Sequence, residues 1–440
     1  MSSTTQIRTL TDVIDTEYKE YSMYVVENRA IPAYTDGFKN VHRKIVYAAL
    51  NHFKNKKVKV AELGSSISSL AAYHHGETSA MGAAITLAAD WNNNMPVLQG
   101  SGNFGSRLIQ EAAAPRYIFA ELSKDFYKYF TDFSVCTKHS DPENPEPQQY
   151  LPIIPWVLVN GIEGIAVGFA CRYLPHSPKD IAKACIKAVN GKLKDDATIP
   201  VTLPGFKGEI IQETQIKIVT RGIVDRVKRN TWLISEVPWG FDREKFFLHL
   251  DKMVEQGKIQ DFEDQCDDSG FKFTVKMDGK MDETCAKDPI SYFKLERSFS
   301  ENYTALDEEG KLIQFNTKAE IVNRFVDFRI KKVQERLEFD SKKLQDEINW
   351  LDAKANFIND IVNKKVNLVN HKKAELITLC TERYNVLQEV ANRLVSIPVY
   401  DMTSDSYEDL INKIKEKKAE KENLDNSDPR EVYLSMLKSI

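Results

Sequence analysis

A long helical pattern begins at Ile321 and constrains the fold of this 440-residue chain more than any other feature. Its apolar residues recur at steps of three, four and seven, which predicts one face of a coiled coil. They are Ile330, Val333, Leu337, Leu344, Ile348, Leu351, Ala355, Ile358 and Val362. A compact segment follows, and then a second charged helix with Leu410, Ile414 and Leu424 on one side.

Taken alone, such charge-rich sequence is equally typical of a solvated surface helix. Two such stretches on either side of one globular segment favour an antiparallel arm instead. We therefore predict a long antiparallel coiled-coil arm at 321–364 and 403–440, with a helical globule at 365–402 between its two helices.

The composition is that of an ordinary globular protein, with 42% hydrophobic and 28% charged residues and a net charge of −4. Its length allows several domains. The six cysteines include no C-x-x-C pair, which argues against a zinc ribbon or a disulfide framework and for a reducing compartment. No run of 18 apolar residues and no secretion signal is present, so a cytoplasmic protein with no membrane partner is expected.

Basic residues are concentrated in one early segment, although the whole chain is acidic. Residues 29–59 carry eight Lys and Arg against Asp36 alone, a local charge of +7. Residues 1–28 before this basic patch predict an N-terminal helical arm, whose first helix starts at Thr11 or Asp12. Short helices at 41–51, 60–70 and 78–89, followed by the glycine-rich stretch VLQGSGNFGSR, predict a winged helix-turn-helix domain at 29–155.

Residues 156–320 have a different character. β-Branched runs such as GEIIQETQIKIVTRG alternate there with short helical pieces bounded by Gly, Pro and Asp. This pattern predicts an α/β domain, so the chain as a whole is predicted to be a multidomain α+β protein.

Two motifs could be mistaken for cofactor sites. Gly100, Gly102 and Gly105 fit G-x-G-x-x-G, the fingerprint of a dinucleotide-binding oxidoreductase, but a clean helix after the glycines is missing and a tight turn fits better. His74 and His75 are adjacent, and neighbours in sequence rarely point into one tetrahedral metal site. We therefore predict no metal site in this chain, and expect these imidazoles either to bond phosphate oxygens or to be satisfied surface side chains.

The pair Arg116 and Tyr117, in AAAPRYIFAEL, suggests chemistry on a phosphodiester. A phenol that acts as a nucleophile needs a cationic setting, and an adjacent guanidinium also neutralises the phosphate under attack. The three alanines and the proline before the pair let a bulky duplex approach the backbone closely. Packing alone would also explain a lone Arg-Tyr pair.

Five segments taken together resemble the DNA breakage-reunion (gyrase A-like) subunit of the type IIA DNA topoisomerases. They are RAIPAYTDGFKNVHRKIVYAAL, AAYHHGETSA, VLQGSGNFGSR, AAAPRYIFAEL and VNGIEGIAVGFACRYLPH, which occur in the family's order. The wording is more similar to the eukaryotic enzymes than to bacterial gyrase, and the short separate chain resembles bacteriophage members of the family. The resemblance implies a winged-helix (CAP-like) DNA-gate domain, an α/β tower domain at 156–320, and a C-gate at 365–402 through which a homodimer forms.

The resemblance also implies roles for individual residues. Tyr117 would attack a DNA phosphorus and hold the 5′ end, while Arg116 would stabilise the scissile phosphate. The remaining catalytic assignments would be Arg29, Lys39, His42 and His75, and the DNA contacts would include His74, Arg43, Lys44 and Ser79. Ile165 would be the apolar wedge that bends the DNA, and Thr78 and Ser79 would lie where inhibitors of the family bind.

Parts of the family's machinery are not recognisable in this sequence. It contains no P-loop and no D-x-D motif after an apolar strand, so the resemblance implies that a partner subunit holds ATP and that the partner's TOPRIM domain holds Mg²⁺. The chain alone is expected to be inactive. Because no DNA-wrapping domain follows the returning helix, we expect relaxation of supercoils rather than their introduction. The rival interpretation from a binding class is a winged-helix architectural protein that bends DNA without cutting it.

Overall fold

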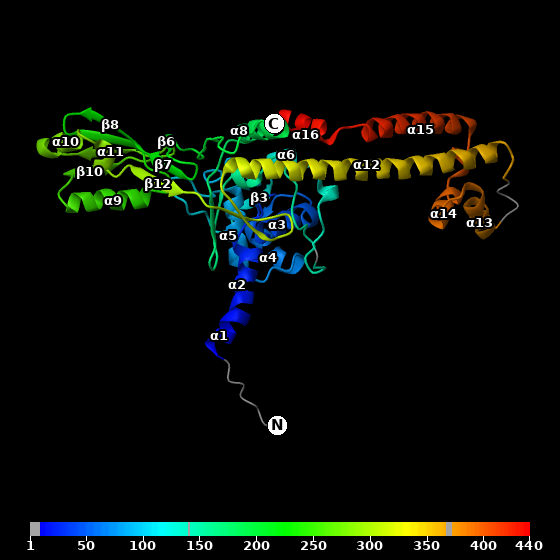
Figure 1. Cartoon of the computed structure of the whole chain (residues 1–440), viewed down its shortest axis with the longest axis horizontal. Coiled ribbons are helices and arrows are strands. Elements are labelled where there is room, and N and C mark those ends of the chain that lie inside the picture. Colours follow the sequence, from blue (N-terminus) through cyan, green and yellow to red (C-terminus); the bar gives the residue numbers. More distant parts are fainter. Residues whose placement is uncertain (1–8, 140, 367–371) are drawn as a thin grey trace, which may run out of the picture. The chain divides into compact units, whose positions relative to one another are not determined.

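The computed structural model describes residues 9–139, 141–366 and 372–440, and Figure 1 shows the order of the elements along the chain. The described chain forms two compact units. The first contains the residues up to Arg329 together with Leu434–Ile440, and the second contains Ile330–Tyr433. Residues 1–8 of the predicted N-terminal arm and residues 367–371 of the predicted globule lie outside the described residues.

The first unit begins with a nearly continuous helix, which comprises α1 (Leu10–Val13), π-helical Ile14–Tyr18, α2 (Lys19–Val25) and π-helical Val26–Ala30. Thr9 caps its start: the Thr9 hydroxyl accepts a bond from the Asp12 amide (3.1 Å), and the Asp12 carboxylate accepts one from the Thr9 amide (2.9 Å). The helix therefore starts at Leu10, slightly before the predicted position. No side chain of α1 or α2 is buried within the described chain.

Three helices then pack together as α3 (Asn40–Tyr47), which a π-helical turn extends to His52, α4 (Val60–Leu70) and α5 (Glu77–Ala88). The bounds of α4 are those predicted, and α3 and α5 start one residue earlier than predicted. Gly64 lets α4 approach α5 closely, because a Cβ at Gly64 would lie 2.5 Å from Cγ of Met81. A small antiparallel sheet adjoins these helices in the order β1 (Val58–Lys59), β3 (Phe119–Leu122) and β2 (Leu98–Ser101).

The chain between the small sheet and the larger sheets forms α6 (Lys124–Tyr129), 3-10 helical Phe133–Val135, α7 (Trp156–Val159), β4 (Ile162–Ile165), β5 (Ala170–Tyr173) and α8 (Pro178–Val189). The strands β4 and β5 pair as a short hairpin, and the segment after β5 is linked to the start of the longest helix. Just beyond β5, the carboxylate of buried Glu301 accepts a bond from the Leu174 amide (2.9 Å). The same carboxylate pairs with the ammonium of Lys318 (2.8 Å), the first residue of α12 (Lys318–Val362).

Three antiparallel sheets complete the strands of the first unit. One has the order β12 (Glu296–Ser300), β7 (Lys217–Arg221), β6 (Glu209–Gln212). Another has the order β10 (Asp261–Asp264), β11 (Phe273–Lys276), β9 (Thr231–Glu236), β8 (Ile223–Lys228). The last is the pair β13 (Tyr303–Leu306) and β14 (Leu312–Phe315).

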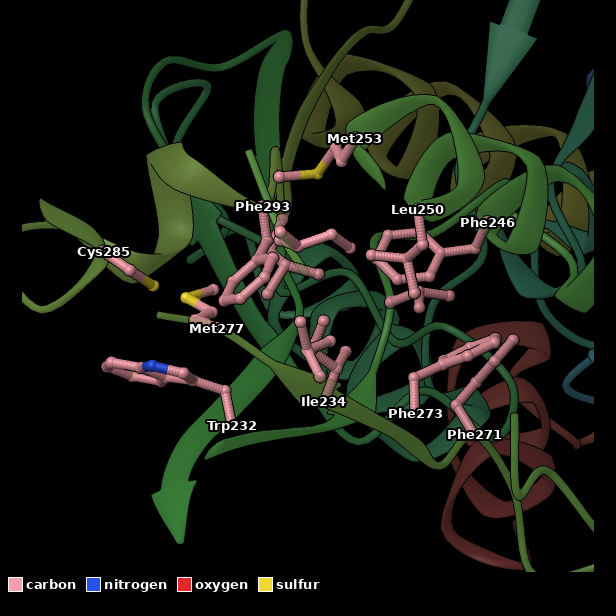
Figure 2. Close-up of a cluster of buried hydrophobic side chains, with 14 residues drawn as sticks. Trp232, Ile234, Phe246, Leu250, Met253, Phe271, Phe273, Met277, Cys285 and Phe293 are labelled. Carbon is pink, nitrogen blue, oxygen red and sulfur yellow. The ribbon is translucent and has the colours of Figure 1, made fainter. Parts of the chain in front are cut away.

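The four-stranded sheet has its own apolar core. Helices α9 (Arg243–Glu255), α10 (Gly279–Cys285) and α11 (Pro289–Tyr292) contribute side chains to this core. Figure 2 shows Phe246 and Leu250 of α9 together with Ile234 of β9 and Phe273 of β11, all of them buried. At the edge of this core the indole of Trp232 donates to the carboxylate of Asp282 (2.8 Å).

The second unit is helical and contains an antiparallel helix pair. α12 continues into this unit, followed by α13 (Lys373–Tyr384), α14 (Gln388–Val395), 3-10 helical Val399–Asp401 and α15 (Ser404–Asp425), and α16 (Pro429–Lys438) begins there. Ile414 of α15 packs on Leu351 and Ala355 of α12, and the hydroxyl of Ser341 bonds the carboxylate of Asp425 (2.6 Å). The middle of α12 thus faces the end of α15, and residues further along α12 face earlier residues of α15, so the two helices labelled in Figure 1 run antiparallel.

Helices and antiparallel sheets together give the mixed character expected of a multidomain α+β chain. The finer division into winged helix, tower, coiled coil and globule, with the boundaries given above, stays a prediction. Among the described residues, no helix is both long enough and apolar enough to cross a bilayer.

Candidate functional site

Tyr117 lies on a turn that is fixed on both sides to the start of α4. Its amide bonds the carbonyl of Ala114 (2.9 Å), and the carbonyls of Pro115 and Ile118 accept bonds from residues 61 and 60 (3.1 and 3.0 Å). The side chain is 68% exposed, and the guanidinium carbon of Arg116 lies 5.0 Å from the centre of its ring. A rigid backbone therefore presents an accessible phenol beside a cation.

Five of the predicted site residues meet in a cavity of about 230 Å³ although they come from three separate segments. Arg29 ends the N-terminal helix, Lys39 and His42 come from the start of α3, and His75 and Ser79 flank the start of α5. Asn28, Val41, Tyr73 and Ala83 complete the lining. Arg116 and Tyr117 are not among the lining residues.

The histidines of this cavity are held neutral. Burial, together with the charges of Lys39 and Arg43, lowers the pKa of His42 to about 3. Burial, together with Arg29 and His74, also lowers the pKa of His75. At neutral pH the positive charge of the cavity therefore comes from Arg29 and Lys39, and the imidazoles act as hydrogen-bonding groups.

Arg43 and Lys44, which the resemblance places among the DNA contacts, are both buried in ion pairs, which argues against that role. The guanidinium of Arg43 pairs with Asp36 through Nε (2.7 Å) and Nη2 (2.9 Å). The ammonium of Lys44 pairs with Glu146 (2.7 Å), which is 1% exposed. These two cations neutralise buried carboxylates and are not available to a phosphate.

The hairpin of β4 and β5 presents an apolar tip. Ile165 is 80% exposed, and Val167 and Phe169 beside it are also exposed. The base of the hairpin is fixed: the ammonium of Lys39 donates to the carbonyl of Glu163 (2.8 Å), and Gly164 lies against the carbonyl of Ala30. Only Ile165 was predicted from the sequence, although alternation in IAVGF is a signal that could have identified the other two.

The remaining predicted residues lie near the start of α5. His74 and Thr78 are exposed, and the hydroxyl of Ser79 accepts a bond from the hydroxyl of Tyr73 (3.2 Å). Tyr24 was not predicted, and its hydroxyl lies 3.0 Å from Nε2 of His75. No local signal could have revealed this contact, since the two residues are 51 positions apart in the sequence.

The glycine-rich stretch does not form a dinucleotide-binding turn. Gly100 belongs to β2, no helix follows before β3, and the left-handed backbone of Gly102 (φ +112°) and Gly105 (φ +84°) makes a turn. A Cβ on Gly102 would lie 2.8 Å from the side chain of Ile118, the residue after Tyr117. The turn thus packs beside Tyr117. A dinucleotide-binding fingerprint requires a helix directly after its glycines, and the absence of this helix excludes the oxidoreductase interpretation.

The described residues hold no group of three His, Cys, Asp or Glu side chains placed to bind a metal ion.

Comparison with known proteins identifies the family. The profile of the A-type subunits of DNA gyrase/topoisomerase IV matches residues 29–439. The DNA topoisomerase medium subunit of Enterobacteria phage T4 is 37% identical over 444 residues, which cover 98% of this chain and 99% of the phage protein. The mitochondrial DNA topoisomerase 2 of Dictyostelium discoideum is 28% identical over 98% of this chain, which spans only 35% of that enzyme.

A solved structure of the same family has a similar fold. The DNA-binding, cleavage and re-ligation domain of Plasmodium falciparum topoisomerase II superposes with a TM-score of 0.87 at 27% identity, covering 97% of this chain and 63% of that chain. The resemblance noted in the sequence is therefore confirmed. The chain belongs to the family of the A-type subunits of DNA gyrase/topoisomerase IV, the cleavage and religation part of the type II DNA topoisomerases.

Proposed function

We propose that this chain is the DNA-cleaving and religating subunit of an ATP-dependent type II topoisomerase, with Tyr117 as its nucleophile. The observation that carries the proposal is the 68% exposed phenol of Tyr117 beside the Arg116 guanidinium, on a turn fixed to α4. The phenolic oxygen bonds to a DNA phosphorus while the bond from that phosphorus to the 3′ oxygen breaks. The phenol loses its proton, the 3′ oxygen gains one, and religation reverses both changes.

The cavity of Arg29, Lys39, His42 and His75 suits a DNA phosphate. Two cations supply attraction, and two neutral imidazoles supply directional hydrogen bonds. Arg116 does not line this cavity; beside Tyr117, it would stabilise the negative charge that the attacked phosphate gains. We expect Ser79 to contact the DNA at the rim of this cavity, and Thr78 and Ser79 to border the region where inhibitors bind.

The tip of the hairpin would enter the DNA. Ile165, with Val167 and Phe169 beside it, forms an exposed apolar wedge on a fixed base. Insertion of an apolar side chain between base pairs unstacks a step and bends the duplex, at a cost of a few kcal/mol that wider protein contact offsets.

The rest of the machinery would come from other chains. We propose that a partner subunit binds ATP and that its TOPRIM domain holds Mg²⁺, which supplies charge stabilisation to the phosphoryl transfer. A homodimer formed through residues 365–402 would place one Tyr117 on each strand, since its two-fold symmetry matches that of a duplex. Passage of a second duplex through the break would relax supercoils. We expect this reaction to take place in the cytoplasm.

A single substitution tests the nucleophile. The chain is mixed with the ATPase/TOPRIM partner, Mg²⁺ and labelled DNA, the covalent adduct is trapped with denaturant, and the modified peptide is mapped by mass spectrometry. We expect the adduct on Tyr117, its loss in Tyr117→Phe, and its retention in Tyr127→Phe, which alters another exposed tyrosine. An adduct in Tyr117→Phe would refute the assignment, and bending of DNA by the wild type without any adduct would favour an architectural protein.

A further inference from the structure

Tyr24 brings the N-terminal helix into contact with His75, which lines the cavity of Arg29, Lys39 and His42. Its hydroxyl oxygen lies 3.0 Å from Nε2 of His75, and the two ring centres are 5.9 Å apart. Tyr73, from the segment before α5, contacts the same imidazole edge to face at 5.4 Å and 78°. His75 is thus held by two aromatic side chains from different segments, and one of them also makes a hydrogen bond.

The hydrogen bond decides which nitrogen of His75 carries the proton. The imidazole is neutral at neutral pH, because burial and the nearby charges of Arg29 and His74 lower its pKa. A neutral imidazole has one donor and one acceptor nitrogen, and the bond made by one nitrogen fixes the role of the other. The phenol is the stronger acid of the two groups, so its hydroxyl donates to Nε2 and the proton of the ring resides on Nδ1.

The remaining nitrogen is the one that a ligand can use. Within the described residues, Nδ1 of His75 has no hydrogen-bond partner, while the side chain lines the cavity with Arg29 and Lys39. A phosphate oxygen accepts hydrogen bonds only, so the cavity needs a donor at this position and an acceptor nitrogen would repel the ligand. The tautomer set by Tyr24 meets this need.

We propose that Tyr24 is a positioning residue for His75: its hydroxyl holds the imidazole in the tautomer protonated on Nδ1, so that His75 donates a hydrogen bond to a DNA phosphate. This inference rests on the proposed function, because it takes DNA as the ligand of the cavity. Tyr24 itself does not touch the reacting atoms. It lies five residues before Arg29 on one nearly continuous helix, so the same helix supplies both a cation and the group that orients the imidazole.

A double-mutant cycle tests this role in the complex reconstituted with Mg²⁺ and the partner subunit. We compare Tyr24→Phe, His75→Ala and the double variant with the wild type, and measure the rate of adduct formation at saturating DNA and the affinity for DNA. Tyr24→Phe keeps the ring and should slow adduct formation about 3- to 10-fold, the usual effect of one lost hydrogen bond. The bond to the phosphate strengthens as the phosphate gains negative charge during the reaction, so DNA affinity should fall less than the rate does. The double variant should be no slower than His75→Ala alone.

Tyr21→Phe is the matched control, since Tyr21 is 59% exposed on the same helix. It should leave the rate unchanged. A Tyr24→Phe variant as fast as the wild type, an equal loss in the His75→Ala background, or the same loss in Tyr21→Phe would each overturn the proposal.

A second measurement separates this inference from the proposed function. If the wild type forms no adduct on Tyr117, the proposed function fails, and the tautomer can still be read from ¹⁵N chemical shifts of histidine-labelled protein, with His75 assigned by the His75→Ala variant. We expect Nδ1 protonated in the wild type and a mixture of tautomers in Tyr24→Phe. A proton on Nε2 in the wild type would refute the role of Tyr24 whatever the protein does to DNA.

Discussion

Gly164 joins the hairpin to the N-terminal helix, and its substitution by alanine tests whether this contact holds the wedge in place. A Cβ at this position would lie 2.1 Å from the carbonyl oxygen of Ala30 and 3.1 Å from Sγ of Cys171. Real Cβ contacts are not shorter than 3.0 Å, so strand β4 or the backbone at Ala30 must move by at least about 0.9 Å, the difference from 2.1 Å. Neither neighbour is a flexible side-chain end that could turn away.

The cost of this movement follows from the contacts it disturbs. Overpacking of a well-filled site costs about 1 to 3 kcal/mol. A shift of this size can also break the bond between the Lys39 ammonium and the Glu163 carbonyl (2.8 Å), a loss of about 0.5 to 1.5 kcal/mol. We expect Gly164→Ala to lower the free energy of unfolding by about 2 to 4 kcal/mol.

DNA bending should fall together with stability, because the displaced hairpin carries Ile165. The backbone at Ala30, against which Gly164 packs, also adjoins Arg29 of the cavity. The free energy of unfolding is measured by urea titration, and DNA bending by energy transfer between dyes at the ends of a duplex. Gly82→Ala is the control: Gly82 is exposed in α5 and nothing lies within 4 Å of its added Cβ, so we expect a gain of about 0.5 to 1 kcal/mol and normal bending. A Gly164→Ala variant that is as stable as the wild type and bends DNA normally would refute the reasoning.

Lys44→Ala should destabilise the fold by about 3 to 5 kcal/mol, since it leaves Glu146 buried without its cation, while the salt dependence of DNA binding stays unchanged. Lys57, an exposed residue of the basic segment 29–59, should behave in the opposite way. Lys57→Ala loses only an exposed bond to the Ser101 hydroxyl (2.6 Å), so urea stability should fall by no more than about 1 kcal/mol. The slope of log affinity against log salt should fall by about 0.9, and equal slopes would exclude Lys57 as a phosphate contact. His42 has a pKa of about 3 in the folded chain, below its usual 6.5, so the unfolded chain binds more protons between these values. The stability that neutral His42 contributes is therefore complete above pH 6.5 and is lost as the pH falls toward 3. In urea titrations the free energy of unfolding should fall less steeply with decreasing pH in His42→Asn than in the wild type, and equal pH profiles would contradict this.

Local sequence was sufficient for several of the helices and for the main motifs. The bounds of α4 and the length of the helical region after Ile321 follow from apolar spacing, which depends only on residues a few positions apart. The exposed pair of Arg116 and Tyr117 and the exposed Ile165 were likewise predictable, because glycine, proline and small residues around them mark turns whose side chains reach solvent.

Only the tertiary structure distinguished cations that look alike in the sequence. Lys39, just before α3, lines the cavity with His42, whereas Lys44, five residues later, is buried against Glu146. Glu146 lies about 100 residues further along the chain, and no local pattern encodes its position. The contact of Tyr24 with His75 arises in the same way, when the N-terminal helix comes to lie beside the start of α5. Periodicity fixes which residues share a face of a helix, but the partner of that face depends on long-range packing, and in this protein that packing decides which charged groups can reach DNA.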